Sequence, residues 1–258
     1  IESLQSLDIS RCTRFISSTL IYLSLLPSLT ELYMNGCPHI TNQHFKEISG
    51  CESLRELSCT YNPYLNSSGV AYLSELTYLE KVDFSGCSSL DNLSLVALEN
   101  SQNLQYLGLA FCSRLSGEIS RVIKKFENLQ SLDVRATYIN DDFIQDLEEL
   151  SGLKHLDLSA CSRITEEGLY YLSDHKQLEE LVLHNCEQIP LSIFRRWEKS
   201  RLKKLELVAN ETIEDEDLLD LLNLRCLELI DLSLCFRITQ QGVSAFKQAG
   251  FFGKVLIE

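Results

Sequence analysis

The sequence predicts an α/β solenoid, a chain in which a short strand and a short helix alternate many times. Three observations support this prediction. Leucines recur at a nearly constant interval along the 258-residue chain, apolar and polar residues alternate after each of these leucines, and a polar residue follows at most of the corners before the next apolar stripe. A solenoid gains one strand and one helix with each repeat, so its length is not limited by a single core.

The repeat length follows from the first leucine of each repeat. The repeats begin at Leu4, Leu29, Leu54, Leu79, Leu104, Leu129, Leu153, Leu178, Leu202, Leu227 and Phe252. The interval is constant except before Leu153 and before Leu202, where it is shorter by one position. An interval of about 25 residues lies within the roughly 20–29 residues of leucine-rich repeats. We therefore expect a curved horseshoe with parallel strands on its concave face and short helices on its convex face.

The strand of each repeat is short and has one buried face. In Leu156-Asp157-Leu158 the leucines point inward and the aspartate outward, because successive side chains of a strand lie on opposite faces. For a repeat that begins at residue n, the outward positions are n+2, n+4, n+6 and n+7. These positions form the concave surface.

A helix follows the corner of each repeat. The polar residues at most corners suit a helix N-cap, since their side chains accept hydrogen bonds from the first turn. They are Thr41, Asn66, Asp91, Ser116, Asn140, Thr165 and Thr239. Apolar residues three or four apart, such as Leu169 and Leu172, give each helix one buried stripe, and Trp197 is expected in the core. Arg196 and Asp220 share one position of adjacent repeats and should be neighbours in a mutually neutralising convex surface.

Seven of the ten cysteines occupy one corner position of the repeat: Cys12, Cys37, Cys87, Cys112, Cys161, Cys186 and Cys235. Asn62, Thr137 and Asn210 take this position in the other repeats, which favours a small residue that bonds the backbone of a tight corner. The alternatives are disulfides between neighbours, a metal site and a catalytic thiol. A ladder of thiols extends along a line and does not converge on one metal ion, and no base at a supporting spacing accompanies these thiols.

The repeat also resembles a known family. Repeats of this length with cysteine at this corner and Ile-Thr after it, as in Cys161 to Thr165 and Cys235 to Thr239, resemble the cysteine-containing leucine-rich repeats of F-box proteins and of the antagonist-of-mitotic-exit-network family. The resemblance covers essentially the whole chain. It implies a substrate-recognition arm of a ubiquitin ligase, with ubiquitin-ligase subunits among its partners.

Charge and composition narrow the classes of partner. The net charge of −14 disfavours nucleic acid and favours a protein partner with a basic surface. No apolar run approaches the roughly 20 residues of a membrane span. Ten cysteines without a secretory signal favour a reducing compartment, the cytoplasm or nucleus. We expect residues 1–258 to be a single domain of about ten repeats plus the strand of an eleventh, excerpted from a longer chain.

The concave face carries the candidate binding residues. Aromatic side chains and arginine dominate binding hot spots, and a column of acidic residues at n+4 favours a cationic partner. The protein-binding candidates are Tyr33, Tyr61, Asp83, Tyr106, Phe111, Asp133, Arg135, His155, Asp157, His184 and Asp231. The aspartates are equally consistent with a Leu-Asp-Leu-Ser consensus, and isolated exposed aromatics are common on protein surfaces.

The resulting functional prediction is a non-enzymatic protein-recognition module, a substrate-recognition arm or adaptor of a ubiquitin ligase. We expect no catalytic residues, no metal and no cofactor, because the sequence contains no phosphate-binding loop, nucleophile–base pair or metal cluster. Two alternatives remain. One is a scaffold subunit of a large assembly. The other is a regulator of an enzyme, either an inhibitor or a GTPase activator.

Overall fold

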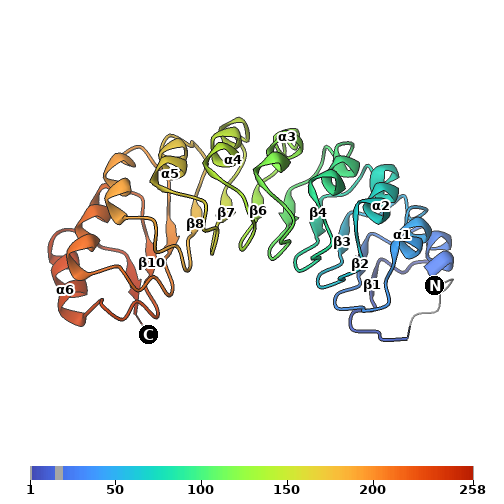
Figure 1. The fold of residues 1–258 in the computed structure, drawn as a ribbon, viewed down its shortest axis with the longest axis horizontal. Helices are drawn as coiled ribbons and strands as arrows, with labels where there is room; N and C mark the ends of the chain where they lie inside the picture. The colour runs from blue at the N-terminus through green and yellow to red at the C-terminus, as the bar shows by residue number, and fades with distance from the viewer. Residues whose placement is uncertain (1, 15–19, 258) are drawn as a thin grey trace. The chain divides into compact units, whose positions relative to one another are not determined.

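The computed structural model describes residues 2–14 and 20–257. The chain forms two compact units, unit 1 (Ile1–Tyr138) and unit 2 (Ile139–Glu258). Strands of three residues alternate with short helical segments in both units (Figure 1), which confirms the predicted α/β leucine-rich-repeat architecture. The single domain over residues 1–258 remains a prediction.

All strands pair in parallel with the next strand of their unit, and residues at the same repeat position are paired, as Leu32 is with Leu57. Unit 1 contains β1 (Ser6–Asp8), β2 (Glu31–Tyr33), β3 (Glu56–Ser58), β4 (Lys81–Asp83), β5 (Tyr106–Gly108) and β6 (Ser131–Asp133). Unit 2 contains β7 (His155–Asp157), β8 (Glu180–Val182), β9 (Lys204–Glu206), β10 (Leu229–Asp231) and β11 (Lys254–Leu256). This register places equivalent side chains of successive repeats in columns.

The helical segments are a mixture of α and 3₁₀ turns (η), as expected for pieces of one or two turns. Unit 1 contains η1 (Leu20–Leu25), α1 (Asn42–Ile48), α2 (Ser67–Val70), η2 (Ala71–Glu75), η3 (Asn92–Leu98), η4 (Gly117–Ile119) and α3 (Ser120–Ile123). Unit 2 contains α4 (Asp141–Asp146), η5 (Leu147–Glu149), α5 (Glu166–Leu172), η6 (Leu191–Arg196), η7 (Asp215–Asn223) and α6 (Gln240–Gln248). No helix in residues 2–14 and 20–257 is long and apolar enough to cross a bilayer.

All seven predicted N-cap residues occupy N-cap positions. The side chain of Thr239, for example, accepts a hydrogen bond of 3.0 Å from the amide of Gly242. A second contact joins neighbouring helix starts, because the first residue of one helix bonds the cap of the next repeat. Asp215 accepts from both the amide (2.8 Å) and the hydroxyl (2.6 Å) of Thr239, and Asp141 does the same for Thr165. The helix starts of successive repeats are thus held in register.

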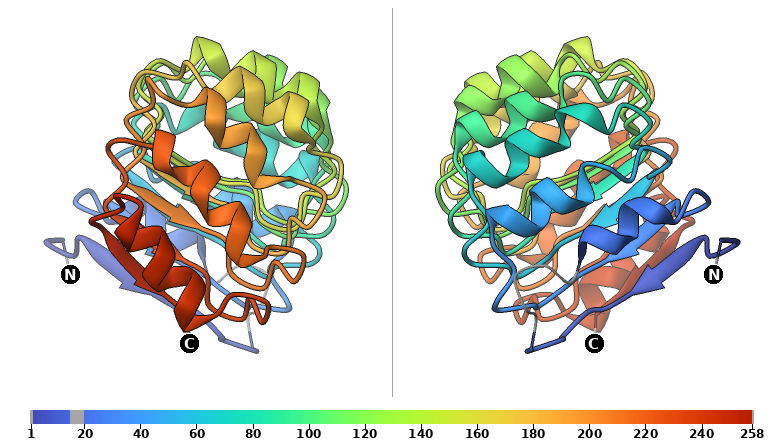
Figure 2. Two further views of the ribbon diagram at one scale, coloured as in Figure 1. Left: turned by 90° about the vertical axis from the view of Figure 1, so that its left-hand side faces the viewer. Right: turned by 90° about the vertical axis from the view of Figure 1, so that its right-hand side faces the viewer.

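The core lies between the strand layer and the helix layer of each unit. Seen from either end (Figure 2), the helices of the nearer unit cover one face of its strands. The inward positions are closed to solvent, as at Leu29, Leu32 and Met34. Trp197 is fully buried, as predicted, and packs edge to face on Phe194 with ring centroids 5.2 Å apart.

The corner cysteines are structural, as predicted, and all ten cysteines are free thiols. The thiol of Cys87 lies 3.0 Å from the carbonyl of Cys59 and that of Cys112 lies 3.3 Å from the carbonyl of Phe84, in each case 28 residues earlier in the chain. Burial raises the pKa of both thiols to about 12, so they stay protonated and donate. A protonated, buried thiol is a poor nucleophile. Cys12, at the same repeat position, is exposed.

The asparagine corners make more bonds than the cysteine corners. The amide nitrogen of buried Asn62 donates to the carbonyls of Met34 (2.8 Å) and Cys59 (2.9 Å), and its oxygen accepts from the amide of Cys37 (2.9 Å). Asn210 makes the equivalent three bonds in unit 2. Asparagine therefore bridges two repeats where cysteine supplies one donor.

A buried histidine makes the stability of unit 2 sensitive to pH. Burial lowers the pKa of His175, although its Nε2 lies 3.0 Å from the carbonyl of Leu150. The His175 imidazole takes up a proton near pH 6.5 in the unfolded chain and at a lower pH in the folded chain. The free energy of unfolding of unit 2 should therefore fall as the pH decreases below about 6.5, until the folded pKa is reached.

Hydrogen exchange of unit 2 amides between pH 7.5 and 5, corrected for the intrinsic exchange rate, measures this dependence. The His175→Gln variant should flatten it, because glutamine carries no titratable proton. The His39→Gln variant, which removes an exposed histidine of unit 1, should leave it unchanged. Equal slopes for the wild type and His175→Gln would show that the prediction is wrong.

Candidate functional site

The candidate site lies on the strand face of unit 1, the surface formed by the outward side chains of β2 to β5. Three of the predicted binding residues, Tyr33, Asp83 and Tyr106, line one pocket of about 350 Å³ together with Glu56, Leu57, Ser58 and Lys81. They meet because n+2 and n+4 of successive strands lie side by side in the parallel register. We call this hollow the strand-face pocket.

Carboxylates dominate the strand-face pocket. The hydroxyl of Tyr33 donates to Glu56 (2.8 Å) and lies 3.4 Å from Glu31, while the ammonium group of Lys81 lies 3.1 Å from Glu56. Burial and then the two carboxylates raise the pKa of Tyr33 well above its usual value, so the phenol remains a donor. Of the residues that line the pocket, Glu56 and Asp83 are acidic and Lys81 is basic, so two carboxylates face one ammonium group.

A buried glycine, Gly108, lies against two residues of the strand-face pocket. Gly108 pairs with Asp83 across β4 and β5. A Cβ atom on Gly108 would overlap the Asp83 carboxylate and would lie 2.9 Å from the Tyr106 hydroxyl. The absent side chain leaves the space in which these two groups approach each other.

The aspartate column also has a local structural role. One carboxylate oxygen of Asp83 accepts from the amide of Ser85 at 2.9 Å, and Asp8, Asp133, Asp157 and Asp231 bond the amide two residues on in the same way. This turn ends each strand. The Leu-Asp-Leu-Ser consensus thus has a physical cause that is independent of any partner.

The position n+7 is not part of the strand. It has positive φ in all ten repeats from Leu4 to Leu227, a conformation that costs residues with a side chain about 1 kcal/mol. Gly36 and Gly86 avoid this cost, whereas Tyr61 and Phe111 incur it while their side chains remain 61% and 47% exposed. The prediction that n+7 is an outward position of the strand is therefore wrong, because the backbone there is left-handed and not extended. The side chains of Tyr61 and Phe111 nevertheless face solvent.

The rings of Tyr61 and Phe111 form an aromatic edge beside the strand-face pocket. A Cβ atom on Gly86, in the intervening repeat, would overlap the Tyr61 ring, so this glycine makes room for it. The guanidinium of Arg135 lies 5.8 Å from the centre of the Phe111 ring and its Nη2 lies 2.8 Å from Asp133. The aromatic edge is thus held in place by its neighbours.

The predicted histidines of unit 2 lie against carboxylates. His155 lies 3.0 Å from Glu180 and His184 lies 2.9 Å from Glu206, which also contacts Lys204 at 2.5 Å. Asp157 and Asp231 end their strands as described for the aspartate column. The structure thus joins both histidines to carboxylates of the next strand.

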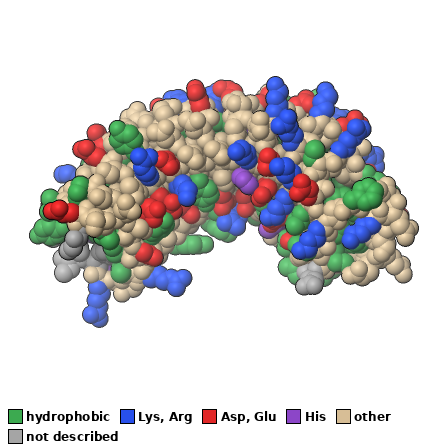
Figure 3. Space-filling view, turned by 180° about the vertical axis from the view of Figure 1, so that it is seen from behind, with side chains coloured by type: hydrophobic (Ala, Val, Ile, Leu, Met, Phe, Trp, Pro, Cys, Tyr) green, Lys and Arg blue, Asp and Glu red, His purple; other side chains and the backbone are tan. Residues whose placement is uncertain are grey.

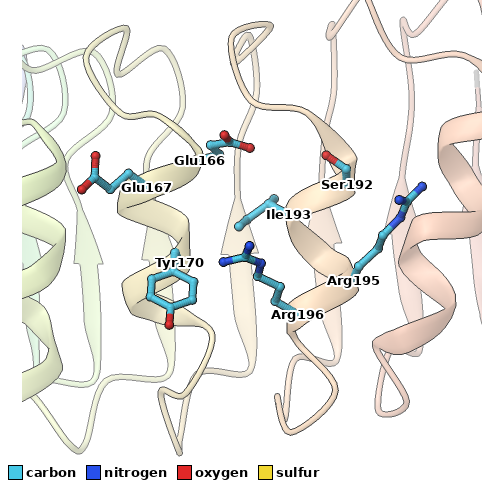
Figure 4. A pocket seen from close by; sticks show the side chains of 7 residues that line it. All are labelled: Glu166, Glu167, Tyr170, Ser192, Ile193, Arg195 and Arg196. Carbon is cyan, nitrogen blue, oxygen red and sulfur yellow. The ribbon is translucent and has the colours of Figure 1, made fainter.

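The helix side of unit 2 contains a second pocket, of about 460 Å³, between α5 and η6 (Figure 4). Both of its arginines contact side chains of this chain. Arg196 lies over the Tyr170 ring at 5.3 Å, and Arg195 pairs with Asp220 at 2.6 Å. We expected Asp220 to contact Arg196, but it contacts Arg195 instead. The Arg195 side chain reaches the next helix.

Charges of both signs are mixed on one face of the molecule. Figure 3 shows acidic and basic side chains interspersed on one face of the molecule. Within the described ranges, no group of three His, Cys, Asp or Glu side chains is placed to hold a metal ion.

No protein-family model and no curated protein matches the sequence. Solved structures do. A chain in the crystal structure of the Rad7 and Elc1 complex in yeast is similar with a TM-score of 0.64 and 17% identity, over 99% of this chain and 74% of that chain. An internalin C2 from Listeria monocytogenes str. 4b F2365 is similar with a TM-score of 0.57 and 21% identity, over 71% of this chain and 72% of that chain. A chain in the crystal structure of the TLR13–ssRNA13 complex is similar with a TM-score of 0.60 and 21% identity, over 90% of this chain and 36% of that chain. The fold is a leucine-rich repeat.

Within this leucine-rich-repeat fold, the sequence reasoning missed some residues of the site. Glu56 and Lys81 stand at the outward position n+2 but were not among the candidates, and Gly86 and Gly108 have no side chain to suggest a role. The usable signal was the column itself. Glu31, Glu56, Lys81 and Tyr106 occupy n+2 in four successive repeats.

Proposed function

We propose that this chain is a non-enzymatic protein-recognition module and that the strand face of unit 1 binds its partner. The aromatic edge carries this proposal. Glycine or alanine fills n+7 in five repeats, so the fold does not require a large ring there. The exposed rings of Tyr61 and Phe111 are thus available for binding, and Tyr is enriched at binding hot spots.

A protein partner fits the charges better than a nucleic acid. The net charge of −14 repels phosphates, and the strand-face pocket has more carboxylates than ammonium groups. The fixed strands also hold their side chains in place before binding, which reduces the entropy lost on association.

We further propose that the partner is a substrate of a ubiquitin ligase and that the chain is its recognition arm, in the cytoplasm or nucleus. Two observations support this assignment. The corner Cys and the Ile-Thr after it resemble the repeats of F-box proteins, and a similar fold occurs in the complex of Rad7 with Elc1. Ubiquitin-ligase subunits recovered with the chain, and ubiquitin transferred to the bound partner, would test it.

The binding face is tested by quantitative affinity capture with Tyr61→Gly and Phe111→Gly. Glycine removes each ring and accepts the left-handed backbone, so the fold is kept. Loss of a hot-spot ring costs about 2 kcal/mol, which corresponds to about a 30-fold loss of affinity for a captured partner. Ala136→Gly is the matched control, since Ala136 has the same backbone conformation (φ 54°) without a ring. Partner recovery that is equal for all three variants and the wild type would refute the proposed face.

A further inference from the structure

We propose that the strand-face pocket binds an arginine side chain of the partner protein. This inference rests on the proposed function and names the chemistry that one part of the face recognises. It is carried by the charge balance and the two aromatic residues of the pocket, which Gly108 helps to bring together.

The charge balance favours a cation. Glu56 and Asp83 are contributed by β3 and β4, and Lys81 is the cation among the residues that line the pocket. Lys81 already lies 3.1 Å from Glu56. Two carboxylates against one ammonium group leave an excess of one negative charge, which a guanidinium group would neutralise. An anionic side chain would instead add to the repulsion.

The aromatic residues favour a flat cation. Tyr33 and Tyr106 line the pocket from β2 and β5, which are separated from each other by β3 and β4. A guanidinium group stacks on aromatic rings and is more weakly hydrated than an ammonium group, so it loses less on leaving water. Its fork of N–H donors also matches a carboxylate with two hydrogen bonds.

Gly108 lets two of the pocket's polar groups come together. A Cβ atom at position 108 would overlap the Asp83 carboxylate and would lie 2.9 Å from the Tyr106 hydroxyl. The partner's arginine would enter the pocket with its aliphatic stem along Ser58, which lines the pocket on β3. Of the described strands, β5 is the one whose outward n+4 residue is glycine.

The test measures backbone amide shifts of the full chain by NMR during titration with a blocked Gly-Gly-Arg-Gly-Gly peptide. We expect saturable shifts at amides of β2 to β5. The citrulline peptide, which has the same shape without the charge, should bind at least tenfold more weakly. The lysine peptide should bind several-fold more weakly, and the glutamate peptide should cause no shift there.

Two variants test the pocket residues. Asp83→Asn keeps an acceptor oxygen for the Ser85 amide and should weaken arginine-peptide binding at least fivefold, as should Tyr106→Leu. Glu127→Gln removes one negative charge from an exposed position outside the pocket and should leave binding unchanged.

The outcomes separate this inference from the proposed function. Equal binding of arginine and citrulline peptides, stronger binding of lysine or glutamate, or shifts confined to other strands would overturn the arginine assignment. If the arginine peptide fails but Tyr61→Gly still loses the captured partner, the strand face remains the binding surface and the arginine pocket is wrong. If the peptide binds as expected and Tyr61→Gly captures the partner as well as the wild type does, the arginine assignment of the pocket is retained. The aromatic edge is then not where the partner binds.

Discussion

Replacing Asn62 with alanine is expected to destabilise unit 1 by about 3 kcal/mol. The side chain holds the amide of Cys37 and the carbonyl of Met34 in a fully buried corner. Alanine would leave both backbone groups without this partner and would leave a void. A buried polar group that loses its hydrogen bond costs about 1–3 kcal/mol.

The Asn62→Cys variant is the matched control. Cysteine occupies this corner in most repeats, where its thiol donates to the carbonyl 28 residues earlier. The backbone amide of the corner cysteine donates within its own repeat, as the Cys87 amide does to the Phe84 carbonyl at 3.0 Å. The Asn62→Cys variant should therefore recover more than half of the loss. Hydrogen exchange of amides in β2 and β3 under native conditions reports this local stability. Equal protection in Asn62→Ala and the wild type would contradict the structural role of the corner.

Replacing Gly242 with alanine should destabilise α6 and its contact with η7 by about 2 kcal/mol. In an ordinary helix interior the same change stabilises by about 1 kcal/mol. Here the new Cβ atom would overlap the Asp215 carboxylate, which holds the cap residue Thr239 by two hydrogen bonds. Moving Asp215 away to admit the methyl group breaks both bonds.

A double-mutant cycle separates this contact from helix propensity. In an Asp215→Gly background the obstructing side chain is absent, and Gly242→Ala should cost little or stabilise slightly. The neighbouring Gln241→Ala, at an exposed position of the same helix, should change the free energy of unfolding by less than about 0.5 kcal/mol. Urea unfolding followed by exchange of α6 amides gives these values. A stabilising effect of Gly242→Ala in the wild-type background would exclude the proposed packing.

Gly242 also explains part of the repeat consensus. Gly69, Gly168 and Gly242 each stand three residues after a helix N-cap, and each lies under the first helical side chain of the preceding repeat, Asn42, Asp141 or Asp215. The glycine of the Ile-Thr-x-x-Gly motif is therefore not a helix-breaking signal. It provides space for the contact that joins successive repeats.

The sequence by itself determined the features that depend on residues close together in one repeat. The regular leucine spacing, the alternation in Leu156-Asp157-Leu158 and the caps such as Thr165 and Thr239 were sufficient to predict parallel strands, short helices and a structural cysteine corner. These features are local, because period-two alternation and N-capping act within a few residues.

The tertiary structure alone decided the contacts between repeats. The convergence of Tyr33, Asp83 and Tyr106 on one pocket depends on how the strands stack, and the position n+7 turned out to be left-handed in ten successive repeats. Whether Asp220 pairs with Arg195 or with Arg196 depends on how far each flexible side chain reaches toward the neighbouring helix. Repeat position fixes where a Cα atom lies, whereas the rotamers and neighbours that complete a contact are set by packing in three dimensions.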